Sequence, residues 1–331
     1  MESSSSSSSS TFQIDARLPK EISWGTIEFL QWEGFWYAKP HLAAVMAARS
    51  HFKARDEDVI LASSMKTGST WLKAIIPCII NSKTSAAGDG NGDNIDEEED
   101  YDPFVEHHPN DLMPALETQI FRQDPNADLS GMPSPRLLRT HMPYSILPES
   151  IKDSACKIVY ITRDPKDVFV SLWHFLNTRI SCPLHEAFES FCNGVHPFGP
   201  FHDHVLGYWK ESLKRPEKIL FLKYEELKSD PTGQVRKLAS FLGRPLVQVD
   251  EVDKLVWKCS FERLKNLEIN RTGVDPHLGF TYKSYFRVGL VGDWKNHLSA
   301  EMRKHLDKIT QTKLEGSGLS HSCKIKIPGP R

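Results

Sequence analysis

Three short apolar segments, each followed by a helix-forming segment, constrain the fold of this 331-residue chain more than any other feature. The apolar segments are residues 58–64, 156–162 and 218–223, and the helical segments that follow them are residues 70–80, 165–177 and 231–242. Pro165 opens the second helix and Gly243 closes the third, which are the favoured places for these residue types. Short apolar strands that alternate with helices are typical of a parallel sheet covered on both faces. We therefore predict an α/β fold with a central parallel sheet flanked by helices.

The formal net charge of −2 bears on the class of partner. A protein that binds nucleic acid through its surface charge carries a strong basic excess, so we predict no nucleic-acid partner. Any anion site must be local. The longest apolar run, near residues 74–80, is too short to cross a bilayer, so we predict no membrane partner.

Two segments have low-complexity composition. Residues 1–17 contain eight consecutive serines, Ser3–Ser10, and we predict a disordered N-terminus followed by a single domain over residues 18–331. Residues 85–102 are acidic and rich in glycine, which predicts a mobile surface loop. The start of the chain has neither the basic nor the apolar region of a signal peptide, which predicts a cytoplasmic location. The six cysteines have neither disulfide density nor metal-ligand spacing, so we predict reduced thiols and no metal site.

The first predicted strand runs directly into a loop with the composition of an anion cradle. Lys66 lies among small and hydroxyl-bearing residues just before a helix, where backbone N–H groups and the helix N-terminus favour a bound anion. In the nucleotide loop of ATPases and GTPases the lysine follows the last glycine, whereas Lys66 precedes Gly68. The loop therefore argues against an ordinary nucleotide triphosphatase.

The segment Lys66-Thr67-Gly68-Ser69-Thr70-Trp71 resembles the 5′-phosphosulfate loop of the soluble (cytosolic) sulfotransferases, which use 3′-phosphoadenosine 5′-phosphosulfate (PAPS) as sulfuryl donor. Further segments resemble the family in the same order along the chain: residues 139–144, 160–173, 221–227, 257–266 and 286–296. The resemblance extends over roughly residues 18–312, and its style is similar to the plant branch. It implies a sulfotransferase fold with a nucleotide loop similar to the P-loop.

The resemblance also implies roles for individual residues. His141 matches the catalytic histidine, and histidine, with an unperturbed pKa near ~6.5, suits the removal of a proton from an attacking hydroxyl. Lys66 matches the lysine that stabilises the transferred group. The residues implied to bind the donor are Lys66, Thr67, Gly68, Ser69, Thr70, Trp71, Arg163, Ser171, Tyr224, Arg287, Val288 and Gly289.

The implied activity is transfer of a sulfuryl group from PAPS to a hydroxyl of a small organic acceptor, without a metal. Acceptors of the plant branch include flavonols, brassinosteroids, hydroxyjasmonates and desulfoglucosinolates. An apolar acceptor pocket is expected, and its candidate aromatic residues are those of residues 32–37, Tyr144, Phe175 and those of residues 280–285.

Two positions depart from the family pattern and leave alternatives open. Met65 stands where the family usually has proline, and Val288 stands where it commonly has lysine. A PAPS-binding protein that has lost catalysis is one alternative, and it predicts donor binding without turnover. A small-molecule kinase is another, but Asp164 is the only tempting magnesium carboxylate at a strand end. The dimer motif of the animal enzymes is not matched after Asn296, so the oligomeric state stays open.

Overall fold

The computed structural model describes residues 14–82 and 102–320. The serine run Ser3–Ser10 and nearly all of the predicted acidic loop at residues 85–102 lie outside these ranges.

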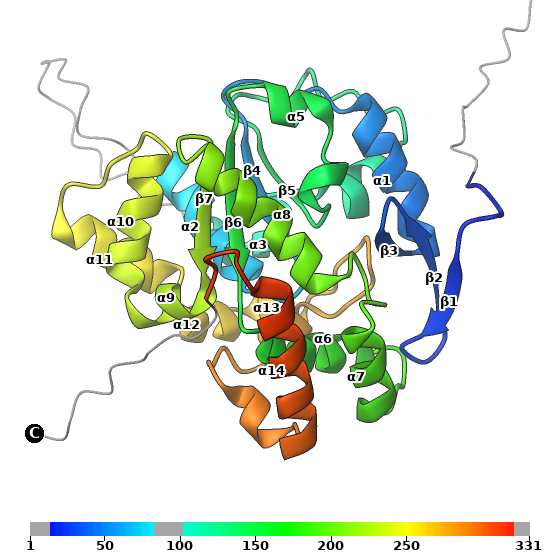
Figure 1. Ribbon diagram of the computed structural model, residues 1–331. Helices are drawn as coiled ribbons and strands as arrows, with labels where there is room; N and C mark the ends of the chain where they lie inside the picture. The colour runs from blue at the N-terminus through cyan, green and yellow to red at the C-terminus, as the bar shows by residue number, and fades with distance from the viewer. Residues whose placement is uncertain (1–13, 83–101, 321–331) are drawn as a thin grey trace, which may run out of the picture.

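A four-stranded parallel sheet lies at the centre of the fold (Figure 1). In spatial order its strands are β5 (Leu137–Thr140), β4 (Val59–Ser63), β6 (Lys157–Thr162) and β7 (Ile219–Lys223). Ile60 of β4 pairs with Leu138 on one side and with Ile158 on the other. The three predicted strands are β4, β6 and β7, so the predicted parallel sheet is confirmed, and β5 is an addition to it.

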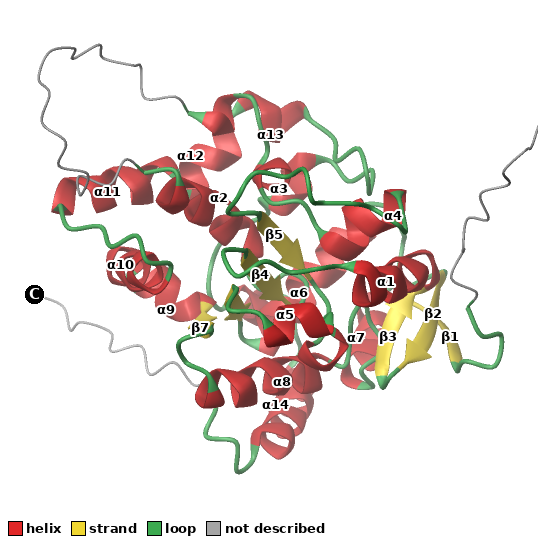
Figure 2. Ribbon diagram, turned by 90° about the horizontal axis from the view of Figure 1, so that it is seen from above, coloured by secondary structure: helices red, strands yellow, loops and turns green. Residues whose placement is uncertain are grey.

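Successive residues of the central strand face opposite layers of helices, because side chains in a strand alternate between the two faces. Val59 and Leu61 belong to the apolar core on one face, and Ile60 and Ala62 belong to the core on the other. The first face packs against α2 (Ser69–Ile80), α10 (Pro231–Phe241) and α11 (Val249–Lys258). The second packs against α1 (Lys39–His51), α5 (Glu149–Asp153) and α8 (Phe201–Lys214). Figure 2 shows these two layers from above, on either side of the sheet.

A second, antiparallel sheet lies beside α1 (Figures 1 and 2). It consists of β1 (Lys20–Ser23), β2 (Ile27–Trp32) and β3 (Phe35–Ala38). Trp24-Gly25 and Glu33-Gly34 form its two turns with positive φ angles, as tight hairpins require. The aromatic side chains of residues 32–37 therefore belong to a structural hairpin.

The remaining helices close the molecule around the carboxyl ends of the parallel strands. The longer ones are α6 (Pro165–Asn177), α7 (Leu184–Cys192) and α14 (Ala300–Leu314), which share a third apolar core with Trp24 and Phe29. The shorter ones are α3 (Pro109–Leu112), α4 (Phe121–Gln123), α9 (Tyr224–Ser229), α12 (Phe261–Asn266) and α13 (Glu268–Thr272). Single turns are η1 (Pro103–Val105), the π-helical η2 (Leu116–Ile120), η3 (Tyr144–Ile146), η4 (Tyr282–Tyr285) and η5 (Asp293–Asn296).

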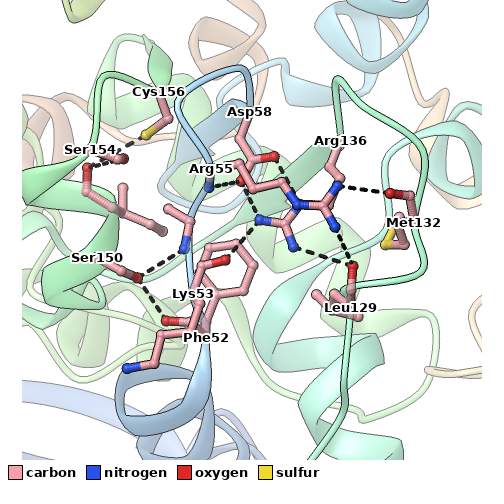
Figure 3. A network of polar contacts seen from close by, with 12 residues as sticks. Phe52, Lys53, Arg55, Asp58, Leu129, Met132, Arg136, Ser150, Ser154 and Cys156 are labelled. Atoms are coloured by element: carbon pink, nitrogen blue, oxygen red, sulfur yellow. Dashed lines mark hydrogen bonds and ion pairs between the residues drawn. The ribbon is translucent and has the colours of Figure 1, made fainter.

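A buried ion pair ties the amino ends of the two neighbouring strands β4 and β5 (Figure 3). Asp58 and Arg136 directly precede these strands, and both side chains are almost completely buried. Arg136 Nε donates to Asp58 Oδ1 at 2.8 Å, and Arg136 Nη2 donates to the carbonyl oxygen of Lys53 at 2.8 Å. The pair lies at the end of the sheet opposite to the cavity described below.

Within the described ranges, no helix is both long enough and apolar enough to pass through a bilayer. Among the cysteines of these ranges, Cys156, Cys182, Cys192 and Cys259 are free thiols.

Candidate active site

The loop between β4 and α2 opens onto a large cavity of about 870 Å³ at the carboxyl ends of the parallel strands. Lys66 and Gly68 have positive φ angles of 64° and 103°, which turn the chain so that α2 begins at Ser69. A Cβ atom at Gly68 would collide with the ring of Tyr224, so only glycine fits there. The first turn of α2 contains no acidic residue, which leaves its N-terminus favourable for an anion.

Lys66 points its ammonium group at aromatic rings on the cavity wall. Its Nζ atom lies 4.0 Å from the ring centre of Phe175 and 5.4 Å from that of Tyr285. Burial, together with the positive charges of Arg287 and Arg163, lowers the pKa of Lys66 to about 7. Lys66 has no carboxylate partner among the described residues, and a cation held in this way among other cations is suited to receive an anionic ligand.

Two arginines on the cavity wall contribute further positive charge near Lys66. Arg163 follows β6, and its Nη2 atom donates to the carbonyl oxygen of Leu290 at 2.6 Å. Arg287 donates through Nη2 to Asp293 at 2.6 Å. The Nε–H groups of both arginines are buried and have no partner among the described residues. Buried donors without acceptors are costly, so this pair fits an anionic group such as a phosphate.

Asp167 connects these two arginine-bearing segments. Its carboxylate pairs with Arg163 at 3.3 Å and is almost completely buried. It also accepts the backbone N–H groups of Gly292 at 2.7 Å and Trp294 at 3.1 Å. One carboxylate on α6 therefore fixes the segment that carries Arg287.

Aromatic side chains form the next part of the wall. Tyr224 donates its hydroxyl to the carbonyl oxygen of Gly289 at 3.1 Å, and its ring lies edge-on to Trp71 with centroids 6.3 Å apart. Gly289 has a φ of +69°, and a Cβ atom there would lie 2.8 Å from the ring of Phe261. The backbone at Gly289 is thus held against two rings, which brings it to the cavity surface.

His141 follows β5, the strand next to β4, and lies on the same cavity wall as the loop that contains Lys66. Its Nδ1 atom is 2.8 Å from the carbonyl oxygen of Ser63, so Nδ1 carries the proton and donates it. Burial and the nearby charge of Arg139 lower the pKa of His141 to about 3. At neutral pH the imidazole is therefore uncharged, with a free lone pair on Nε2.

The backbone of His141 is fastened on both sides. Glu117 accepts the N–H of His141 at 2.7 Å and the hydroxyl of Thr140 at 2.8 Å. The Nε2 atom of His204 lies 2.9 Å from the carbonyl oxygen of His141. The Nδ1 atom of His204 lies 2.9 Å from the hydroxyl of Tyr160. Sequence reasoning missed Glu117, because an acidic residue in a π-helical turn has no motif of its own.

A second buried lysine, which sequence reasoning also missed, lines the cavity beside Lys66. Lys73 lies one turn into α2 and is only 3% exposed, and it donates to the side-chain oxygen of Asn110. Its sequence signal was a lysine within the apolar run Leu72 to Ile76. Burial lowers the pKa of Lys73 well below its ordinary value.

Basic side chains dominate the cavity wall. Nine lysine and arginine residues line it, against two glutamates: Lys39, Lys66, Lys73, Arg122, Arg139, Arg163, Arg179, Lys228 and Arg287, with Glu28 and Glu262. The chain as a whole has a net charge of −2. The prediction of a strictly local anion site therefore agrees with the observed distribution of charge.

The structure brings most of the predicted site residues to this one cavity. Those on its wall are Lys66, Gly68, Ser69, Thr70, Trp71, His141, Arg163, Ser171, Tyr224, Arg287, Val288 and Gly289. Thr67 is the exception, because it is buried and its hydroxyl donates to the carbonyl oxygen of Ser64 at 3.0 Å. Among the acceptor candidates, Phe175, Phe280 and Tyr285 line the cavity, whereas Tyr144 packs against Tyr208.

Comparison with known proteins identifies the family of the chain. Residues 56–318 match the family model of the sulfotransferase domain. Cytosolic sulfotransferase 12 of Arabidopsis thaliana is 38% identical over 318 residues, which cover 94% of each chain. Cytosolic sulfotransferase 8 of the same plant is 39% identical over 321 residues, covering 94% of this chain and 93% of its own.

Solved structures show the same fold. A sulphotransferase of Arabidopsis thaliana is 36% identical and superposes with a TM-score of 0.72, covering 92% of this chain and 93% of its own. A mouse sulfotransferase solved in complex with PAP is 25% identical, with a TM-score of 0.66 over 87% of this chain and 95% of its own. The chain therefore belongs to the sulfotransferase family, in the plant cytosolic branch, and is a PAPS-dependent sulfotransferase.

Proposed function

We propose that the chain transfers the sulfuryl group of PAPS to a hydroxyl of a small organic acceptor, with His141 as the base. The observation that carries this proposal is the neutral imidazole of His141, which has its Nδ1–H bound to Ser63 and its Nε2 free on the wall that it shares with Lys66. PAPS supplies an activated sulfuryl group whose leaving group is adenosine 3′,5′-bisphosphate.

Different residues of the wall bind different parts of the donor. Arg163 and Arg287 bind the 3′-phosphate through their unpartnered Nε–H groups, with Ser171 and the backbone of Gly289 beside them. Trp71 and Tyr224 pack against the adenine. Binding energy gained at this remote phosphate orients the reacting group.

His141 accepts the hydroxyl proton on Nε2 as the acceptor oxygen forms its bond to sulfur and the bond from sulfur to the bridging phosphate oxygen breaks. Lys66 stabilises the negative charge that develops on that bridging oxygen. The N–H groups at the start of α2 add to this stabilisation, as in phosphoryl transfer. The acceptor hydroxyl lies between Phe175 and Phe198, both of which are on the cavity wall.

Two substitutions in the family pattern lie on the same wall. Met65 and Val288 both line the cavity, in positions where the family usually has proline and lysine. If the family's proline and lysine at these two positions are needed for catalysis, the chain would be a PAPS-binding protein without catalysis. The names of the matched relatives support the proposed transfer and a cytoplasmic location.

The test is transfer of label from radioactive PAPS to a panel of flavonols, steroids, hydroxyjasmonates and desulfoglucosinolates. We expect His141→Ala to lose at least about a hundredfold in kcat while the affinity for adenosine 3′,5′-bisphosphate stays within about twofold. The exposed His107 gives a matched control, because it lies outside the cavity, and His107→Ala should retain full activity. Near-wild-type turnover by His141→Ala would disprove the role of the base. Donor binding by the wild-type protein with no labelled product from any acceptor would favour the non-catalytic alternative.

A further inference from the structure

Two arginines lie at the mouth of the cavity, away from the donor-binding residues. Arg122 is on α4 and Arg179 follows α6, and both side chains are exposed and line the cavity. Their neighbour Lys39 is already paired with Glu28 at 2.9 Å. Neither arginine forms an ion pair with a carboxylate of the residues that the structure describes. Within the described ranges, these two positive charges are therefore not neutralised.

A short segment brings the two arginines to the same rim. Arg179 donates through Nη1 to the carbonyl oxygen of Leu278. One residue earlier, His277 Nδ1 lies 2.9 Å from the side-chain nitrogen of Gln123, which is adjacent to Arg122 in α4. Residues 277–278 thus contact Arg179 itself and Gln123, the residue that follows Arg122 in α4.

An aromatic row leads from the catalytic lysine to Arg179. The ring centre of Phe175 lies 4.0 Å from Lys66 Nζ, and Phe280 stacks on Phe175 with centroids 4.1 Å apart. The guanidinium carbon of Arg179 lies 5.4 Å from the ring centre of Phe280. Two rings therefore separate the reacting end from the rim on this side.

A second aromatic row leads from the base to Arg122. The ring of Phe198 lies 5.6 Å from that of His141, and the ring of His41 stacks on Phe198 at 6.3 Å. Arg122 Nη1 lies 3.5 Å from Nε2 of His41. Two rings again separate the reacting end from the rim. Each of the two rows therefore runs from a proposed catalytic side chain, past two aromatic rings, to an arginine.

We infer that the acceptor is a hydroxy acid, with its carboxylate held by Arg122 and Arg179 and its hydroxyl at His141. This inference rests on the proposed sulfuryl transfer. An apolar body about two rings long would lie between the aromatic rows. Each guanidinium group has five N–H donors, most of them uncommitted here, and their planar arrangement matches a carboxylate. Arg163 and Arg287 serve the anionic donor at the other end of the cavity.

The test compares hydroxy acids with their uncharged methyl esters, for which we choose a hydroxyjasmonate and an ω-hydroxy fatty acid. Binding of each compound to the protein that holds adenosine 3′,5′-bisphosphate is measured by calorimetry, and turnover is measured with labelled PAPS. We expect the acid to be preferred over its ester by about tenfold or more in Kd and in kcat/KM. The double variant R122Q/R179Q should bring both ratios close to one, and each single variant should lower them in part.

The control is Arg271→Gln, because Arg271 is exposed, lies on α13 and is not on the cavity wall. It should leave the acid-to-ester ratio unchanged. Equal binding of acid and ester by the wild-type protein, binding of neither, or an unchanged ratio in the double variant would overturn the inference. Preferred binding of the acid without any labelled product would support it and would instead contradict the proposed transfer.

Discussion

The Nδ1 atom of His141 lies 2.8 Å from the carbonyl oxygen of Ser63, the last residue of β4. A carbonyl oxygen only accepts hydrogen bonds, so this contact selects the imidazole tautomer with its proton on Nδ1. The strand that leads into the loop of Lys66 thereby also sets the tautomer of the histidine that we propose as the base. The order of strands β5-β4 places these two functions side by side.

We predict that His141 of the donor-free protein stays neutral well below the pH at which an ordinary histidine becomes charged. Burial lowers its pKa to about 3, so acidification from pH 7 to pH 5 should not protonate it. Nitrogen NMR of labelled imidazoles, assigned with His141→Gln, should show the Nδ1–H tautomer across this range. A midpoint for His141 near the ordinary histidine value would contradict the burial argument.

Binding of adenosine 3′,5′-bisphosphate should be accompanied by proton uptake at Lys66. The pKa of this lysine is about 7 in the free protein, so at pH 8 most of the amine is neutral, and the incoming anion raises the pKa and favours the charged form. Calorimetry at pH 8 in buffers of different ionisation enthalpy should detect close to one proton taken up, and clearly less at pH 6.

Lys66→Met should abolish most of this uptake. Lys254→Met is the matched control, since Lys254 is exposed on α11 and lies outside the cavity, and it should leave the uptake unchanged. Uptake that persists in Lys66→Met would assign the proton to another group, with buried Lys73 the next to examine.

Replacing Gly289 by alanine should weaken donor binding by at least about tenfold, because the new methyl group collides with Phe261 in addition to the strain of a positive φ. Gly243 separates these two effects. It has a nearly equal φ of +71°, and nothing lies within 4 Å of the position of an added Cβ. Gly243→Ala should therefore lose some stability but no donor affinity. Equal donor affinities of the two variants would show that the contact with Phe261 is unimportant.

Breaking the ion pair between Asp58 and Arg136 should destabilise the fold strongly. Arg136→Met leaves the Asp58 carboxylate buried without its charged partner, and the expected loss is about 3 kcal/mol or more in the free energy of unfolding. The exposed pair of Lys313 and Asp203 provides the comparison, since Lys313→Met should cost about 1 kcal/mol or less. Urea unfolding measures both. Similar losses in the two variants would indicate that burial does not strengthen this pair.

The sequence was sufficient to predict the elements whose patterns are local. The three strand–helix units have apolar strands long enough to recognise, and their helices begin at proline or after a turn. The strand β5 was missed because Leu137–Thr140 has only four residues and includes a charged arginine, so its strand conformation depends on pairing with β4. The antiparallel hairpins were missed because Glu33-Gly34 is a weak turn signal.

The site residues, too, were predictable only where the sequence pattern is local. Motif residues such as Lys66 and Arg163 were predicted because their types and order are distinctive. Glu117 and Lys73 were not, since each acquires its role only from a contact with a residue that is distant in sequence. Thr67 belongs to the loop motif, yet its hydroxyl is used inside the loop itself.

The carboxylate of Asp167 has a consequence for the thermodynamics of donor binding. It holds the N–H groups of Gly292 and Trp294 from another part of the chain, with no donor required. The conformational entropy of the segment that follows Arg287 is therefore given up during folding, before any ligand arrives. Donor association then meets a segment that is already ordered, so the free energy of binding is not diminished by the cost of ordering it.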